Sequence, residues 1–318
     1  MAIGTDIKVD TKDKKILYEL EKNARQPISQ IAKKVNLSKE TVNYRIKQLE
    51  KKNVIAGYPT SINSSALGYN LYRLFFKFQN TTPKKEEEII NYLKKIPSIA
   101  RLCSLEGNWD LTVSMSAKNV FEFKRIYDKF IHKYGKHIEQ KYISIATKMY
   151  HFVHNILYDI DDRSYNVSQT EENIVKIDEI DERIIKLLKK DCRIPIIDLS
   201  KKLSLSANAV KHRIQNLVKK NVITSFKIKL NDRPFGYQHY HILLTLQNID
   251  MEKMEDLINT LISNPNVYFI IEAVGEADLE FEVHVRNSSE LYALLKNLRN
   301  KFNCIKEHQT ILFCRSHF

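Results

Sequence analysis

Residues 37–55 carry side chains that could contact a nucleic acid from one face of a helix. Their hydrogen-bond donors recur at helical spacing and could reach base edges or phosphates; they belong to Lys39, Asn43, Tyr44 and Lys47. The opposite face would be apolar, with Val42, Ile46 and Leu49. Ser38 is a suitable N-cap, and Asn53 tolerates the left-handed conformation that ends a helix. An ordinary amphipathic surface helix has the same pattern, so this stretch alone leaves both interpretations open.

The same pattern occurs twice in the chain, at one offset of 168 residues, as from Asp10 to Asp178. In the first part of each copy, the residues that recur are Asp10, Asp13, Arg25, Pro27, Leu37, Ser38, Val42, Arg45, Ile46, Leu49, Asn53, Val54 and Ile55. The register continues downstream through Gly68, Tyr69, Pro97, Gly107, Asp110, Asn119 and Glu139. Two pairs of the 7 glycines fall in this register, which indicates an internal duplication into copy one and copy two.

Composition and charge narrow the class of protein. The 318 residues carry a net charge of +13, which suits a polyanionic partner such as a nucleic acid or an anionic membrane surface. We find neither a signal peptide nor an apolar run long enough to span a bilayer, so we expect a soluble, cytoplasmic protein without membrane association. The 4 cysteines form no C-x-x-C pair, which argues against a zinc ribbon or a disulfide framework.

Each copy begins with a pattern typical of a helix-turn-helix. In copy one, Asp10 and Asp13 would cap a first helix, and residues 28–35 would form a second. The tight turn at residues 36–38 then leads into the helix described above. Three helices with such a short turn between the last two predict a helix-turn-helix in each copy.

The remainder of each copy predicts a β-α-β-β-α-β order. In copy one we expect strands near 72–78, 99–105, 111–116 and from 138, with helices near 86–96 and 120–130. Polar residues alternate with apolar ones in the first strand of each copy, at Arg73 in copy one and at His239 and His241 in copy two, so we expect these strands to be half-buried. This order is typical of a ferredoxin-like fold.

The fold class expected is therefore α+β, with two copies of a winged helix-turn-helix domain followed by a ferredoxin-like domain. We place the helix-turn-helix domains at residues 1–60 and 176–228 and the ferredoxin-like domains at 61–156 and 229–318. Residues 157–175 are rich in aspartate and glutamate and have no apolar period, so we expect a linker. Its length would allow the two copies to pair within one chain as a pseudo-dimer.

Together these motifs resemble the Lrp/AsnC (feast/famine) family of transcription regulators. Copy one carries S-x-x-x-V-x-x-R-I-x-x-L at 38–49, N-V-I-A-G-Y at 53–58 and L-G-Y at 67–69, and both copies keep G-x-x-D-L, at 107–111 and 275–279. The resemblance covers nearly the whole chain twice. This chain departs from the family in carrying two copies, where one per chain is usual, and in lacking the wing glycine after Ile223.

The resemblance implies that the third helix of each copy binds double-stranded DNA. In copy one the contacts would come from Lys39, Asn43, Tyr44, Arg45 and Lys47, and in copy two from Asn208, Lys211, His212, Arg213 and Gln215. The outward residues differ between the copies, so we expect an operator with two unlike half-sites. For Arg45 and Arg213, a salt bridge to Asp13 or Asp181 is the alternative to a phosphate contact.

The resemblance also implies that the ferredoxin-like domains dimerise and can bind a small effector, often an amino acid. The residues that would flank such a site are Gly107, Asp110, Gly275 and Asp278. The alternative is that these glycines and aspartates merely form and cap hairpin turns. Further association of chains into a homo-oligomer is also expected from the family.

Other interpretations of the sequence are less well supported. The histidine pairs His239 with His241 and His151 with His154 lack a completing ligand set, so we predict no metal and no cofactor. No phosphate-binding loop or catalytic motif occurs, so we predict that the protein is not an enzyme. The alternatives that remain are a tetrapyrrole enzyme resembling the sirohaem decarboxylases, which are fused or paired Lrp-like modules, and an architectural, nucleoid-type protein that binds DNA with little sequence preference.

Overall fold

A computed structural model describes residues 9–169 and 174–318, which form two units. The helical unit consists of described residues 9–67, 153–164 and 174–237, and the sheet unit of residues 68–152, 165–169 and 238–318. Each unit thus contains part of copy one and part of copy two. Both helix-turn-helix domains lie in the helical unit, and both ferredoxin-like domains lie in the sheet unit.

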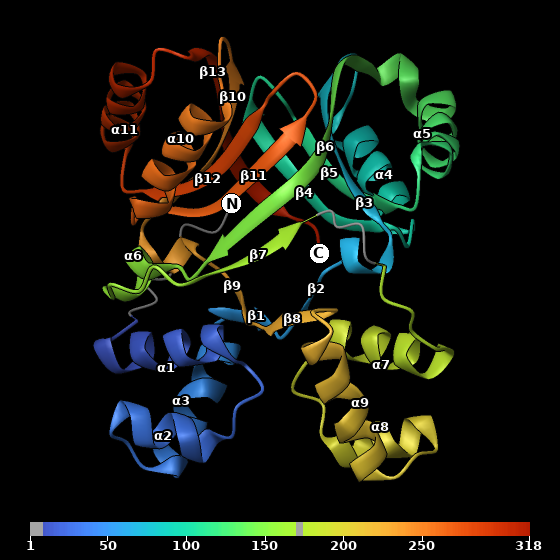
Figure 1. Cartoon of the computed structure of the whole chain (residues 1–318), viewed down its shortest axis with the longest axis vertical. Helices are drawn as coiled ribbons and strands as arrows, with labels where there is room; N and C mark the ends of the chain where they lie inside the picture. The colour runs from blue at the N-terminus through green and yellow to red at the C-terminus, as the bar shows by residue number, and fades with distance from the viewer. Residues whose placement is uncertain (1–8, 170–173) are drawn as a thin grey trace. The chain divides into compact units, whose positions relative to one another are not determined.

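The helical unit contains two matching groups of three helices (Figure 1). Copy one contributes α1 (Thr11–Lys22), α2 (Ile28–Val35) and α3 (Lys39–Lys51), and copy two contributes α7 (Glu179–Lys190), α8 (Ile196–Leu203) and α9 (Ala207–Lys219). Asp10 and Asp13 form a reciprocal capping box at α1. Asn36 and Ser204 adopt the left-handed conformation in the two tight turns. The helix-turn-helix predicted for each copy is confirmed.

Short strands join the two copies within the helical unit. Strand β1 (Ile55–Gly57) of copy one pairs with β9 (Lys229–Leu230) of copy two, and β2 (Thr60–Ile62) pairs with β8 (Ile223–Phe226). The pairing is nearly symmetric. At the 168-residue offset, β8 is the equivalent of β1 and β9 is the equivalent of β2, so the first wing strand of each copy pairs with the second wing strand of the other. Each wing is therefore completed by the other copy, and the pairing forms although copy two lacks the wing glycine.

Two arginines reinforce this junction in a matching way. Arg25 Nη1 donates to the carbonyl oxygen of Ile194 at 3.0 Å, and Arg193 Nη1 donates to that of Ala24 at 2.9 Å. The guanidinium of each also lies over an aromatic ring of the other copy, Phe226 or Tyr58. Because a guanidinium is never deprotonated in proteins, these contacts fix the two helical groups against each other at any ordinary pH.

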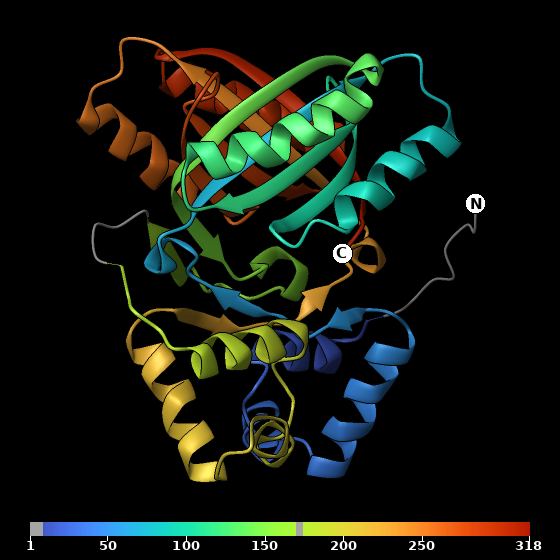
Figure 2. The ribbon, with the colours of Figure 1, turned by 90° about the vertical axis from the view of Figure 1, so that its right-hand side faces the viewer.

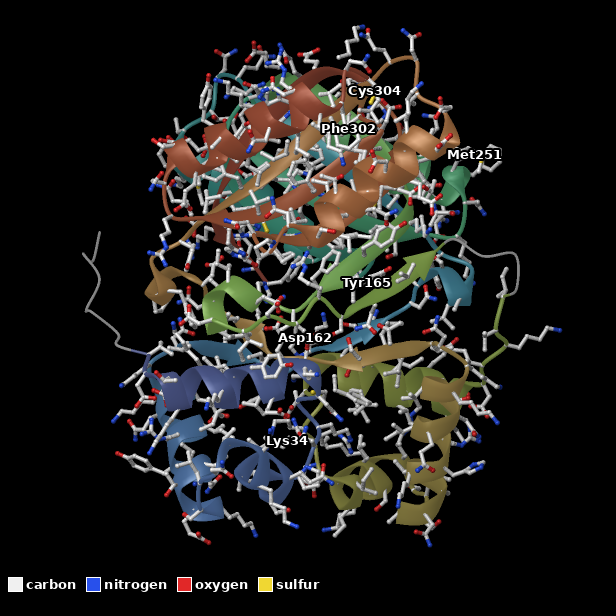
Figure 3. The ribbon with its side chains drawn as sticks, turned by 60° about the vertical axis from the view of Figure 1, so that its left-hand side comes forward. Lys34, Asp162, Tyr165, Met251, Phe302 and Cys304 are labelled. Carbon is white, nitrogen blue, oxygen red and sulfur yellow. The ribbon has the colours of Figure 1, made fainter. Side chains whose placement is uncertain are left out.

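The linker predicted at 157–175 is wrong over two segments. Helix α6 (Asn155–Tyr158) packs Leu157 and Tyr158 into the core of the helical unit, and Asp162 accepts hydrogen bonds from Tyr18 and Lys22 on α1 (Figure 3). Strand β7 (Tyr165–Gln169) pairs with β6 in the sheet unit. Two of the acidic side chains that suggested a solvated linker, Asp159 and Asp162, form ion pairs with Lys14 and Lys22 of α1. Residues 170–173 of the predicted linker lie outside the described residues.

The sheet unit confirms the β-α-β-β-α-β order in both copies. Copy one forms β3 (Asn70–Phe78), α4 (Pro83–Lys94), β4 (Ile99–Gly107), β5 (Leu111–Ala117), α5 (Val120–Tyr134) and β6 (Ile138–Phe152). Copy two forms β10 (Gln238–Leu246), α10 (Met251–Ser263), β11 (Val267–Val274), β12 (Leu279–Val285), α11 (Ser288–Lys301) and β13 (Ile305–Ser316). Phe302 and Cys304 belong to the core beneath α10 and α11, whereas Met251 projects from the start of α10 (Figure 3).

The four-stranded sheets of the two copies pair along both of their edges, so together they form one closed sheet. The strand order is β11-β12-β10-β13-β4-β5-β3-β6, and β6 also pairs with β11, while β7 adds to β6. Within the sheet unit, helices α4, α5, α10 and α11 lie outside the curved sheet (Figure 2). The intrachain pairing predicted for the ferredoxin-like domains is therefore confirmed.

Closure changes the burial expected for the first strand of each copy. The alternating pattern predicts half-buried strands with Arg73 of β3 and His241 of β10 on the polar side, but both side chains are buried. Their side chains point to the face of the sheet opposite the helices, and closure of the sheet removes this face from water.

Candidate nucleic-acid interface

The outward face of α3 is built as the sequence predicts. Ser38 Oγ accepts a hydrogen bond from the N–H of Thr41 at 3.1 Å, which fixes the first turn, and Val42, Ile46 and Leu49 are buried. Lys39, Tyr44 and Lys47 are exposed, and Asn43 is half-buried. Tyr44 leaves 63% of its surface exposed, although an aromatic ring of this size is usually covered. Three of these four side chains are therefore exposed to solvent.

The outward face of α9 has the same framework and different chemistry. Ser206 caps the helix, and Val210, Ile214 and Leu217 are buried. The predicted contact residues Asn208, Lys211, His212 and Gln215 are all exposed. At the 168-residue offset, Lys211 stands where copy one has Asn43, His212 where it has Tyr44, and Gln215 where it has Lys47.

A shallow pocket of about 390 Å³ lies along α9 beside α7. Its polar lining includes His212, Asn216 and Lys220, which recur every four residues and so share one helical face. Asn216 and Lys220 were not among the predicted contact residues, although their spacing from His212 is the signal that would have included them. Hydrogen-bonding side chains and a lysine side by side suit the edge of a base next to a phosphate.

Arg45 and Arg213 form the ion pairs considered as the alternative to phosphate contact. Arg45 Nη1 lies 2.8 Å from both Asp10 Oδ2 and Asp13 Oδ1, and Arg213 Nη1 makes the matching contacts with Asp178 and Asp181. The N–H of Asp181, which donates to Asp178, and the Arg213 guanidinium lower the pKa of Asp178. Each arginine therefore ties the third helix of its copy to the first.

The four residues predicted to flank an effector lie on two separate hairpins of the sheet unit. Asp110 accepts from the N–H of Phe78 at 2.7 Å, and Asp278 accepts from that of Leu246 at 2.7 Å. These bonds tie each hairpin to the end of another strand of the same copy, β3 or β10, which is a structural role different from capping the turn itself. Effector binding at these residues stays a prediction.

The glycines of these hairpins allow close approach of the other copy. A Cβ at Gly275 would lie 2.8 Å from the carbonyl oxygen of Ile143, and one at Gly107 would lie 3.2 Å from that of Thr310. Gly107 also has a φ of +121°, which L residues rarely adopt. The two tips differ chemically, because the indole N–H of Trp109 donates to Gln309, whereas the backbone N–H of Ala277 donates to the Tyr142 hydroxyl.

The histidines considered as metal ligands have other partners. His239 Nε2 lies 3.0 Å from Glu282 and His241 Nε2 lies 2.8 Å from Glu280, while His154 pairs with Glu21. The ring of His151 lies against that of Phe269. Within residues 9–169 and 174–318, no helix combines the length and apolar character needed to cross a membrane.

A comparison with solved structures identifies a match to the fold of the whole chain. The crystal structure of the siroheme decarboxylase NirDL has a TM-score of 0.65 and covers 96% of this chain and 92% of its own. At 13% identity, the match shows a shared fold.

Comparisons by sequence identify the family. A winged helix-turn-helix DNA-binding model matches residues 9–56 and 177–224. The HTH-type transcriptional regulator FL11 of Pyrococcus furiosus is 32% identical over 120 residues, which cover 38% of this chain and 78% of the relative. The HTH-type transcriptional regulator LrpA of Pyrococcus horikoshii is 38% identical over 100 residues, which cover 31% of this chain and 70% of the relative. The chain therefore belongs to the Lrp/AsnC family of helix-turn-helix transcription regulators, with two copies of the family's architecture in one polypeptide.

Proposed function

We propose that this chain regulates transcription by binding an asymmetric operator through two unlike helix-turn-helix heads. The observation that carries the proposal is the contrast between the two third helices. Their buried residues, caps and arginine ion pairs match, whereas the outward residues Lys39, Asn43, Tyr44 and Lys47 all differ from their offset equivalents Ala207, Lys211, His212 and Gln215. A framework held constant beneath a varied surface is what two different base-reading faces require.

The junction between the heads supports simultaneous binding. The paired wing strands and the contacts of Arg25 and Arg193 join both heads into one unit of the fold. When one head docks on DNA, the second head is already at high local concentration, so its docking is effectively intramolecular. Each head can therefore bind weakly while the pair binds selectively, and an amino-acid effector or further oligomerisation would act on this basic unit.

The first prediction concerns base reading by copy one. Replacing its outward residues with those of copy two, by Lys39→Ala, Asn43→Lys, Tyr44→His and Lys47→Gln, should convert one half-site into the sequence preferred by copy two. Binding to the original operator should weaken about 10-fold or more, because each mismatched base pair costs on the order of 1–3 kcal/mol. Selection from random duplex DNA measures both effects. Lys15→Ala, an exposed change on α1, is the control and should leave the selected sequence unchanged; an unchanged sequence in the four-residue variant would contradict base reading by α3.

The second prediction separates a phosphate contact from a structural ion pair. Lys47→Met should lower the slope of log affinity against log salt by about 1, because one phosphate contact is lost. Arg45→Met should leave this slope unchanged and lower the free energy of unfolding by about 1 kcal/mol, since its partly exposed ion pairs with Asp10 and Asp13 are lost. Fluorescence anisotropy with labelled DNA and thermal unfolding followed by circular dichroism give the two quantities. A reduced slope in Arg45→Met would reassign this arginine to the DNA.

The third prediction tests the enzyme alternative, which rests on the shared fold of the siroheme decarboxylase NirDL. That protein has also been solved in complex with an iron-uroporphyrin III analogue. In this chain, Phe75, Trp109 and Tyr142 pack with residues of copy two across the inside of the closed sheet. We therefore expect no change in the porphyrin absorption band when the analogue is titrated with purified protein. A saturable, stoichiometric shift of that band would support the tetrapyrrole enzyme instead.

A further inference from the structure

The closed sheet holds a buried group of charged side chains, which we call the inner charge network. Its centre is Glu280 on β12, which is fully buried. Glu280 Oε2 lies 3.1 Å from Arg73 Nε and 2.8 Å from His241 Nε2, and its Oε1 accepts a hydrogen bond from Ser144 at 2.8 Å. Of these partners, His241 lies on the adjacent strand β10 of copy two, whereas Arg73 and Ser144 come from β3 and β6 of copy one.

Glu282, two residues further along β12, extends the network. Arg101 donates to both of its oxygens, at 2.6 and 3.0 Å, in the bidentate geometry that makes such pairs strong. His239 and Tyr268 contact the same carboxylate, and His241 lies 3.3 Å from it, between the two glutamates. Burial alone would raise the pKa of Glu282, but Arg101 and the two histidines lower it well below its usual value. At Glu280 burial likewise acts to raise the pKa, and Arg73 and His241 lower it below the usual value, so both glutamates are held as carboxylates.

The charges are divided unequally between the copies. Both guanidinium groups, of Arg73 and Arg101, come from copy one, and both carboxylates come from copy two. At the 168-residue offset, Thr112 and Ser114 stand in copy one where copy two has the glutamates. His241 and Phe269 stand in copy two where copy one has the arginines. The arginine–glutamate pairs of the network therefore form when a copy-one sheet faces a copy-two sheet.

Large and small side chains inside the closed sheet are also divided between copy one and copy two. Phe75, Trp109 and Tyr142 of copy one pack in one buried cluster with smaller residues of copy two, which include Leu243, Ala277 and Ile311. The offset equivalents of the three aromatic residues are Leu243, Ala277 and Thr310. Two copy-one sheets would bring six large rings together, and two copy-two sheets would leave this volume underfilled.

Pairing of like sheets would also leave charges without partners. Two copy-one sheets would bury Arg73 twice against threonine and serine without a carboxylate, and two copy-two sheets would collect four glutamates that keep their histidines but have no arginine. A buried charge without a partner is strongly destabilising, whereas the backbone pairing of the edge strands hardly distinguishes the three combinations.

We propose that the inner charge network is a recognition surface that lets a copy-one sheet pair with a copy-two sheet and rejects a second sheet of its own kind. The partner that fits the copy-one surface is a sheet with two buried carboxylates, supplied by the same chain or by copy two of another chain. If two chains swap domains, we expect the copy-one sheet of each chain to pair with the copy-two sheet of the other.

The test lets the full chain fold and then cuts it. A specific protease site is introduced at residues 170–173, the folded protein is cleaved, and the two fragments are dissociated in urea and allowed to reassemble. Native mass spectrometry then counts the fragment pairs. We expect unlike pairs to exceed either like pair by about 10-fold or more. A statistical mixture of the three pairings would overturn the proposal.

A matched variant locates the source of the preference. Arg73→Met, Arg101→Met, Glu280→Gln and Glu282→Gln together remove the charges with little change in volume, and like pairs should then appear. Lys124→Met with Asp128→Asn removes an exposed ion pair on α5 and should leave the preference intact. A preference that survives the first variant would show that the network does not cause it.

A second measurement on the uncut chain covers the case in which the fragments fail to reassemble. Glu280→Gln should lower the urea midpoint, because Arg73 is left without its carboxylate, and adding Arg73→Met should restore part of the loss. Fluorescence of Trp109, the single tryptophan, follows the sheet unit. Strictly additive effects of the two substitutions would contradict the proposal.

Discussion

The structure depends on backbone hydrogen bonding between the edges of the two copies. A four-stranded ferredoxin-like sheet has two edge strands whose N–H and C=O groups need partners. Here β4 pairs with β13 and β6 pairs with β11, so each copy supplies the partner of the other and the sheet closes. The wing strands satisfy the same requirement within the helical unit, where β1 pairs with β9 and β2 with β8. Duplication in one chain makes both pairings intramolecular.

Because the two copies are covalently joined, they have been free to differ wherever the pairing does not require symmetry. The aspartate caps, the buried apolar positions of the first helices and the backbone contacts of Arg25 and Arg193 remain matched. The outward faces of α3 and α9 differ, and so do the side chains that meet inside the closed sheet. An assembly of two identical chains would have to present the same face twice. A single chain with two different copies can present two different faces.

Much of this organisation could be predicted from the sequence, because helix caps and alternating strands are local signals. Asp10, Ser38 and Asn36 each act where their residue types indicate. The alternation of β12, with Glu280, Glu282 and His284 between apolar residues, has the ordinary pattern of a strand with one solvated face, yet every residue of β12 is buried. Only the closure of the sheet by strands distant in sequence makes that face internal. Helix α6 and strand β7 were missed for a related reason, because their few apolar residues lie among acidic ones whose basic partners are on α1.

The measurement that tests the account most directly is the selection of binding sites by the unmodified chain from random duplex DNA at physiological salt. Two unlike reading faces predict an enriched site with two different half-sequences, separated by about one helical turn of DNA or a multiple of it. A perfect palindrome would contradict the non-equivalence of the two heads. A pool without any enriched sequence would contradict sequence-specific regulation and favour an architectural role.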